Sequence, residues 1–301
     1  MEFAHQSVLL NECIDALAIK PDGIYLDGTL GGAGHSLQIC RNLTTGRLIG
    51  VDRDLVALEA AKKRLYRHAK KVTLVHDNFE NVGAILTALG LDRIDGMLFD
   101  LGVSSPQLDD AERGFSYKYD GPLDLRLNPE AGISAAERLR TVARDELEGM
   151  LIENADEPYA KEISQAVTRA LRKGKKIDTT FALRDLIAEA LDFLPKDEKK
   201  EAIKKSCART FQALRIDVNN EYEVLEAFME KLPDALAPGG RAAILTFHSG
   251  EDRLVKKSMK GLYQIGIYSE YSKEVIRPSK EECIRNSRAS STKMRWAIKA
   301  E

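Results

Sequence analysis

The chain has 301 residues, of which 44% are hydrophobic and 31% are charged, and its formal net charge at pH 7 is -2. This length and apolar content are enough for a full hydrophobic core, which excludes a disordered or fibrous protein. The net charge argues against a protein that coats nucleic acid, although it leaves room for local basic patches.

Helical and strand-like patterns alternate through the first hundred residues. The expected elements are, in chain order, a helix at about 7–18, a strand at 24–27, a helix at 35–43, a strand at 47–52, a helix at 55–68, a strand at 72–76, a helix at 81–89 and a strand at 95–101. Such regular alternation predicts a doubly wound α/β arrangement around a parallel sheet.

The alternation stops after this region. Residues 105–205 hold turn-forming sequence followed by charged helical patterns, and the next strand pattern is at 241–247, after Ala237-Pro238-Gly239-Gly240. This order predicts a helical insertion between two adjacent strands of one sheet. Alternation at about 263–276 and 292–299 then predicts an antiparallel hairpin at the sheet edge.

The boundaries of these parts follow from the same patterns. We expect residues 1–104 and 206–301 to form one domain, with residues 105–205 inserted as a helical domain. The cysteines Cys13, Cys40, Cys207 and Cys283 have no Cys-x-x-Cys spacing, so neither a zinc site nor a disulfide framework is indicated. No apolar stretch reaches the roughly 20 residues of a membrane helix, and the first residues lack the features of a signal or transit peptide. These observations predict a cytoplasmic protein without a membrane segment or a metal.

The most informative segment, Ile24–His35, leads from a strand into a glycine-rich turn. Asp27 ends this strand and Asp52 ends the next one. Strand, glycine loop, helix, strand and acid in this order are typical of a nucleoside cofactor held across the carboxyl ends of a parallel sheet. A dinucleotide site would have a small residue where Leu37 stands, and the charge of Asp27 suits a cationic ligand. The pattern therefore favours S-adenosylmethionine, which carries a sulfonium and an ammonium, over a purely structural turn.

Acidic or polar residues end each of the first four predicted strands. They are Asp27, Asp52, Asp77 with Asn78 and Phe79, and Asp100. The carboxyl ends of parallel strands line one crevice, so these residues favour a ligand site over separate helix caps. Phe79 could cover the face of an adenine ring, and the alternative is that it belongs to the core.

Longer motifs run from end to end of the chain. The longest, Leu101–Phe115, follows the fourth strand, and further matches are His5–Leu10, Asp22–Thr29, Gly121–Arg126, Arg209–Ile216 and Thr246–Ser249. With these motifs the chain resembles the RsmH (MraW) family, the bacterial 16S ribosomal RNA cytosine-N4 methyltransferases. It departs from the family pattern at Ala33, where glycine is common, at Gly250, where leucine is usual, and at Arg285-Asn286-Ser287-Arg288, which lacks the usual proline.

The resemblance implies a fold, a cofactor and a set of site residues. The implied fold is a Rossmann-like class I methyltransferase, with a mostly parallel seven-stranded sheet and a helical insertion domain that recognises the substrate. The family's positions for S-adenosylmethionine match Ala33, Gly34, His35, Asp52, Phe79, Asp100 and Gln107. The implied partner is 16S ribosomal RNA within the small ribosomal subunit, and a homodimer is left open.

The implied reaction needs proton acceptors next to a weak nucleophile. The exocyclic amine of cytosine shares its lone pair with the ring, so it must be aligned with the methyl donor while acceptors hold its protons. We expect Asp100, the carbonyl groups around Ser104, and His248 to contribute, with Phe247 and His248 facing a base that has left its stack. The alternatives are that Asp100 only binds the cofactor's ammonium group and that His248 is a hydrogen-bonded strand end.

Three basic stretches are candidates for RNA contact: Lys161–Lys176, Lys196–Arg209 and Arg285–Lys299. The second mixes acid with base and is expected to be a solvated helix face, whereas the first and third are expected to contact phosphates. Aromatic residues in Gly114–Tyr117 could stack on unpaired bases or pack within a loop.

Two other functions are compatible with parts of the sequence. A non-catalytic ribosome-assembly factor could retain the cofactor site as a structural element. A DNA amino-methyltransferase is disfavoured, because Leu101-Gly102-Val103 follows Asp100 where a proline-proline-aromatic loop is usual.

Overall fold

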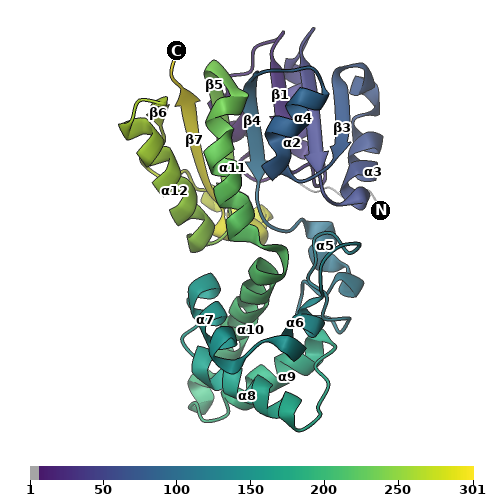
Figure 1. Ribbon diagram of the computed structural model, residues 1–301, viewed down its shortest axis with the longest axis vertical. Helices are drawn as coiled ribbons and strands as arrows, with labels where there is room; N and C mark the ends of the chain where they lie inside the picture. Colours follow the sequence, from purple (N-terminus) through teal and green to yellow (C-terminus); the bar gives the residue numbers. More distant parts are fainter. Residues whose placement is uncertain (1–6) are drawn as a thin grey trace. The chain divides into compact units, whose positions relative to one another are not determined.

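A seven-stranded sheet with the strand order β3-β2-β1-β4-β5-β7-β6 dominates the first of two compact units in the computed structural model, which describes residues 7–301 (Figure 1). The strands are β1 (Ile24–Asp27), β2 (Arg47–Asp52), β3 (Val72–His76), β4 (Ile94–Asp100), β5 (Leu236–Thr246), β6 (Tyr268–Tyr271) and β7 (Lys293–Lys299). β1 to β5 pair in parallel, and β7 runs antiparallel to both β5 and β6. The predicted mostly parallel α/β sheet is confirmed.

Helices cover both faces of this sheet because successive strand residues bury opposite sides. The helices of the first unit are α1 (Leu10–Leu17), α2 (Gly34–Asn42), α3 (Leu55–Arg64), α4 (Val82–Ala88), α11 (Glu221–Ala235), α12 (Ser249–Gln264) and α13 (Lys280–Arg285). Leu26 and Phe99 pack with residues of α4 and α11, whereas Tyr25 and Leu98 pack with residues of α1 and α2. Burial of both faces is the property of a doubly wound sheet.

The strand order reverses beside β1, which lies between β2 and β4. In register, Asp27 lies beside Gly50 of β2 and Leu98 of β4. Ligands of open α/β sheets bind outside the carboxyl ends of the strands at such a reversal. The fold therefore places the ends of β1 and β4 where the sequence predicts the ligand crevice.

Several element boundaries differ from the sequence prediction. The helix expected at 55–68 ends at Arg64 and continues as a 3-10 segment at Tyr66–Lys71. The strand expected from 241 begins earlier, at Leu236, so Pro238-Gly239-Gly240 lies inside β5, at a register shift against β4. The hairpin pattern expected from 263 overlaps the end of α12, and its first strand is limited to β6. His5 and Gln6 of the first family motif lie outside the described residues.

The second unit, Val103–Tyr222, is helical and has its own core. Its helices are α5 (Ser105–Asp109), α6 (Ala135–Thr141), α7 (Arg144–Ala155), α8 (Ala160–Arg172), α9 (Thr180–Ala190) and α10 (Lys196–Asn219). The predicted boundary at 205/206 falls within α10, whose residues Cys207, Phe211 and Leu214 belong to the core of the second unit. The insertion therefore extends to Tyr222, and it lies in the chain between the paired strands β4 and β5. No helix within residues 7–301 is both long enough and apolar enough to cross a membrane.

Candidate active site

The carboxylate of Asp27 is buried at the end of β1. Its oxygens accept hydrogen bonds from the Ser36 hydroxyl, at 2.6 Å, and from the Thr29 backbone N–H, at 3.2 Å. The pKa of Asp27 is raised to about 7, mainly by burial and to a smaller extent by the charge of Asp52, against the lowering effect of the two hydrogen bonds. Asp27 is thus a fixed anchor for the glycine loop and α2, and its ionised form would be stabilised by a nearby cation.

Asp52 holds the glycine loop from the end of β2. Its two oxygens accept the backbone N–H groups of Gly31, at 3.1 Å, and Asp54, at 2.9 Å. Burial raises the pKa of Asp52, and these two hydrogen bonds oppose that rise. Each carboxylate oxygen has a second lone pair, so the group can still accept hydroxyl donors such as those of a ribose.

The turn into α2 requires unusual backbone geometry. Ala33 has a left-handed φ of 56°, which favours glycine and explains why glycine suits this position. A Cβ on Gly34 would lie 2.0 Å from the Ser7 hydroxyl, so only glycine fits there without displacement. His35 is buried, with Nε2 at 3.0 Å from the Val8 carbonyl and Nδ1 at 3.8 Å from Oδ2 of Asp100. The predicted residues Ala33, Gly34 and His35 therefore shape the loop with their backbone and pack beneath it.

Asp100 ends β4 on the other side of the strand reversal. Its backbone N–H donates to Oγ1 of Thr29 at 2.5 Å, which ties β4 to the glycine loop. Its Oδ1 is buried and has no hydrogen-bond partner among residues 7–301. Burial raises the pKa of Asp100 to about 7, and the charges of Asp27 and Glu251 raise it as well. An orphaned acceptor of this kind is costly unless a donor from a ligand reaches it.

Phe79 follows β3 and is partly exposed. Its ring makes edge contacts with Phe99, at a centroid distance of 5.5 Å, and with Phe228, at 5.1 Å. One edge of the ring therefore belongs to the core of the first unit, while part of its surface faces outward.

Asp77, in contrast, is a local cap. Its Oδ1 accepts hydrogen bonds from the Asn78 backbone N–H and from Nδ2 of Asn81.

Ser104 and Gln107 belong to the second unit. The Ser104 N–H donates to Oε1 of Gln107 at 2.9 Å, and the Gln107 N–H donates to Oγ of Ser104 at 3.4 Å. This reciprocal pair fixes the first turn of α5 in the manner of a capping box.

His248 caps the N-terminus of α12 after β5. Its Nδ1 accepts the Glu251 N–H at 3.4 Å, and its Nε2 lies 3.3 Å from Oε1 of Glu251. The other oxygen of the buried Glu251 carboxylate accepts the Phe247 N–H at 2.9 Å. This geometry favours the strand-end alternative for His248. Sequence reasoning missed Glu251, although its spacing of three residues after a helix cap is the signal of a capping box.

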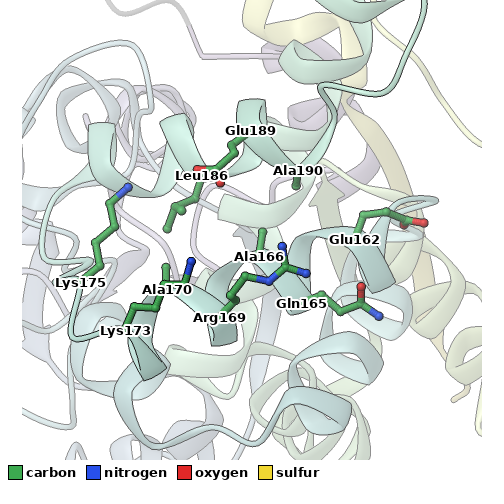
Figure 2. A pocket seen from close by; sticks show the side chains of 10 residues that line it. All are labelled: Glu162, Gln165, Ala166, Arg169, Ala170, Lys173, Lys175, Leu186, Glu189 and Ala190. Carbon is green, nitrogen blue, oxygen red and sulfur yellow. The ribbon is translucent and has the colours of Figure 1, made fainter.

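A pocket of about 360 Å³ lies between α8 and α9 within the second unit (Figure 2). Arg169, Lys173 and Lys175 of the first basic stretch line it. Their side chains form no ion pair or hydrogen bond within residues 7–301. The carboxylates of Glu162 and Glu189 also lie at the pocket, so its charged lining is positive by one. We call this feature the α8–α9 groove.

The sequence was then compared with known proteins. A model of the MraW methylase family matches residues 2–300. A protein of Lachnoclostridium phytofermentans named ribosomal RNA small subunit methyltransferase H 1 is 57% identical over 300 residues, which cover 98% of this chain and 81% of that protein. A protein of Lachnospira eligens named ribosomal RNA small subunit methyltransferase H is 42% identical over 311 residues, covering 98% of this chain and 97% of that protein.

Solved structures give a more distant likeness. A putative rRNA methylase from Clostridium thermocellum has a TM-score of 0.46 and 12% identity, covering 99% of this chain and 100% of the other. A putative methyltransferase from Streptococcus mutans in complex with SAH has a TM-score of 0.41 and 12% identity, covering 98% of this chain and 99% of the other.

Proposed function

This chain belongs to the MraW methylase family, and on that premise we propose that it transfers a methyl group from S-adenosylmethionine to the N4 amine of a cytosine in small-subunit 16S ribosomal RNA. The family that the motifs suggested is thereby confirmed. The names of the relatives from Lachnoclostridium phytofermentans and Lachnospira eligens support a small-subunit ribosomal RNA substrate. The cytosine-N4 position rests on the sequence resemblance.

The observation that carries the proposal is the orphaned, buried Oδ1 of Asp100 at the strand reversal. A carboxylate held there beside Asp27 fits a ligand that brings N–H donors and positive charge. Within the same unit, Asp52 would accept the ribose hydroxyls, the outer face of Phe79 would cover the adenine, and the turn at Ala33–His35 would approach the cofactor closely. Gln107, in the second unit, is the remaining predicted contact. S-adenosylmethionine supplies an electrophilic methyl group on a sulfonium.

The protein's own task is to align the amine and accept its proton. The amine becomes acidic as its nitrogen forms the new bond, so a carboxylate placed beside it can take the proton. Asp100 is our candidate for this acceptor, together with carbonyl groups near Ser104. The Thr29 hydroxyl accepts the backbone N–H of Asp100. This one hydrogen bond therefore fixes the position of Asp100 relative to the glycine loop. His248 would contribute by holding the turn that carries Phe247.

The test is nucleoside mass spectrometry of small-subunit RNA after incubation with the protein and labelled S-adenosylmethionine. We expect N4-methylcytidine with the parent protein, and its loss with Asp100→Asn at saturating cofactor. Cofactor turnover should require small subunits or their RNA. Cofactor binding without turnover would favour the assembly-factor alternative, and labelled DNA would favour the DNA methyltransferase.

The second unit would supply the RNA contact. The α8–α9 groove is lined by three basic side chains that form no ion pair within residues 7–301, and such side chains can bind phosphate groups.

We also propose a cytoplasmic location, because Cys13, Cys40 and Cys207 are buried free thiols.

A further inference from the structure

Glu251 is a buried carboxylate for which the reaction described above gives no role. It is 3% exposed and lies in the first turn of α12. Its two oxygens contact the two residues before this helix, Phe247 through a backbone N–H and His248 through Nε2. A helix cap needs no buried charge, because a serine at the cap position would serve at lower desolvation cost.

The turn that Glu251 holds lies directly against the end of β4. A Cβ placed on Gly102, which has a φ of +99°, would be 3.4 Å from Cδ2 of Phe247, so the Phe247 ring covers this glycine. Two residues earlier in the chain is Asp100, and between them the Leu101 N–H donates to the Leu245 carbonyl of β5 at 3.0 Å. The ends of β4 and β5 are therefore linked by one backbone bond and one ring contact.

We propose that Glu251 is a positioning residue for methyl transfer: its carboxylate holds the turn of Phe247 and His248 against Gly102 and, when ionised, adds a negative charge near Asp100. The proposal rests on the proposed function, in which Asp100 takes the proton of the amine. The charge of Glu251 raises the pKa of Asp100, because a negative neighbour stabilises the protonated form of a carboxyl group.

Groups on three other elements of the first unit also act on or lie near Asp100. The charge of Asp27 on β1 also raises the pKa of Asp100. The charge of Asp100 in turn raises the pKa of the buried Cys13 thiol on α1. His35 on α2 presents Nδ1 at 3.8 Å from Oδ2 of Asp100, and its Nε2 lies 3.0 Å from the Val8 carbonyl oxygen. Glu251 is thus the acidic neighbour contributed by α12.

The decisive variant is Glu251→Gln, which keeps an oxygen for the Phe247 N–H and removes the charge. Carbon-13 NMR of the Asp side chains in the free protein should show a lower Asp100 pKa than in the parent protein, since loss of a like charge favours ionisation. The alkaline rise of the single-turnover rate should move to lower pH by the same amount. Glu251→Asp should restore much of the parent midpoint.

The matched control is Asp252→Asn, which removes a charge from the adjacent residue of the same helix turn. Asp252 pairs with Arg295 at 2.7 Å, so this variant should lose stability and leave the Asp100 midpoint unchanged. Equal midpoints in Glu251→Gln and the parent protein would overturn the proposal and leave Glu251 a helix cap. Because the NMR titration needs neither RNA nor cofactor, a failure of the proposed function would show separately, as a parent protein that methylates no small-subunit RNA.

Discussion

Asp52 joins the end of β2 to the glycine loop, and two backbone N–H groups depend on it. Replacing Asp52 by Ala should weaken S-adenosylmethionine binding by about 2 kcal/mol or more, because a carboxylate that accepts ribose hydroxyls makes charge-assisted hydrogen bonds. Isothermal titration calorimetry measures this directly. The exposed Glu59→Ala on α3 is the control for charge alone, and an unchanged affinity in Asp52→Ala would remove this residue from the site.

Asp27 and Asp100 make the stability of the free protein depend on pH. Burial raises the pKa of each to about 7, well above the ordinary value for an aspartate, so between about pH 4 and pH 7 the folded state keeps protons that the unfolded state releases. The free energy of unfolding should therefore fall as the pH rises through this window. Urea titrations without cofactor at several pH values test the slope, and Asp27→Asn should flatten it. A slope that Asp27→Asn leaves unchanged would show that other groups cause it.

At the residue scale, sequence alone located Asp27, Asp52 and Asp100, because strand ends of a parallel sheet can be recognised from apolar runs followed by an acid. It could not show that Asp77 is a local cap, since capping and ligand-facing acids follow strands in the same way. Glu251 was missed although its partners Phe247 and His248 are close to it in sequence, because the histidine that precedes this helix is not one of the usual cap residues Ser, Thr, Asp and Asn.

The close approach of the β1 turn to β4 is an element-scale feature that can be tested with one methyl group. A Cβ on Gly28 would lie 2.0 Å from the ring of Phe99, which is itself packed on Phe228 at a centroid distance of 4.2 Å. Gly28→Ala should lower the free energy of unfolding by about 1–3 kcal/mol, the usual range for overpacking. Chemical denaturation measures it.

The matched control is Gly83→Ala, on α4. A Cβ there meets nothing within 4 Å, so this variant should gain stability by roughly 0.5–1 kcal/mol from helix propensity. If Gly28→Ala were as stable as the parent protein, the ring of Phe99 would have room to move, and the glycine would not be required by packing.

Elements were predicted well where periodicity is strong and poorly where special backbone geometry decides. The first four strands follow from their apolar runs. The early start of β5 could not be predicted, because Pro238-Gly239-Gly240 has the composition of a turn and becomes strand only through its irregular pairing with β4. The sequence also did not predict that α10 is one long helix. Its first half is charged like a solvated helix, whereas its second half packs in the core of the second unit.

At the scale of the whole molecule, the proposed function assigns RNA binding to the second unit and cofactor binding to the first, so the two can be tested separately. Replacing Arg169, Lys173 and Lys175 together by Ala should raise the Michaelis constant for the RNA or subunit substrate and reduce its salt dependence, because fewer counterions are released. Cofactor affinity should stay unchanged. Lys176, in the same basic stretch, does not line the α8–α9 groove and is left in place.

Replacement of the exposed Lys200, Lys204 and Lys205 of α10 gives a control with the same change in net charge within the same unit. It should preserve the salt slope if the second basic stretch is a solvated face. Equal slopes in the groove variant and the parent protein would instead move the RNA contact to Arg285–Lys299.

The second unit begins at Val103 and ends at Tyr222. The strands on either side of it in the chain, β4 and β5, pair directly, and α11 connects the end of the second unit to β5. The sheet thus already has an ordinary crossover, to which the helical unit is an addition with a core of its own. Such a segment is an inserted domain with its own core. A change in its length or sequence would leave the pairing of β4 with β5 intact, and under the proposed function it could therefore alter the choice of RNA without altering the strand ends that bind the methyl donor.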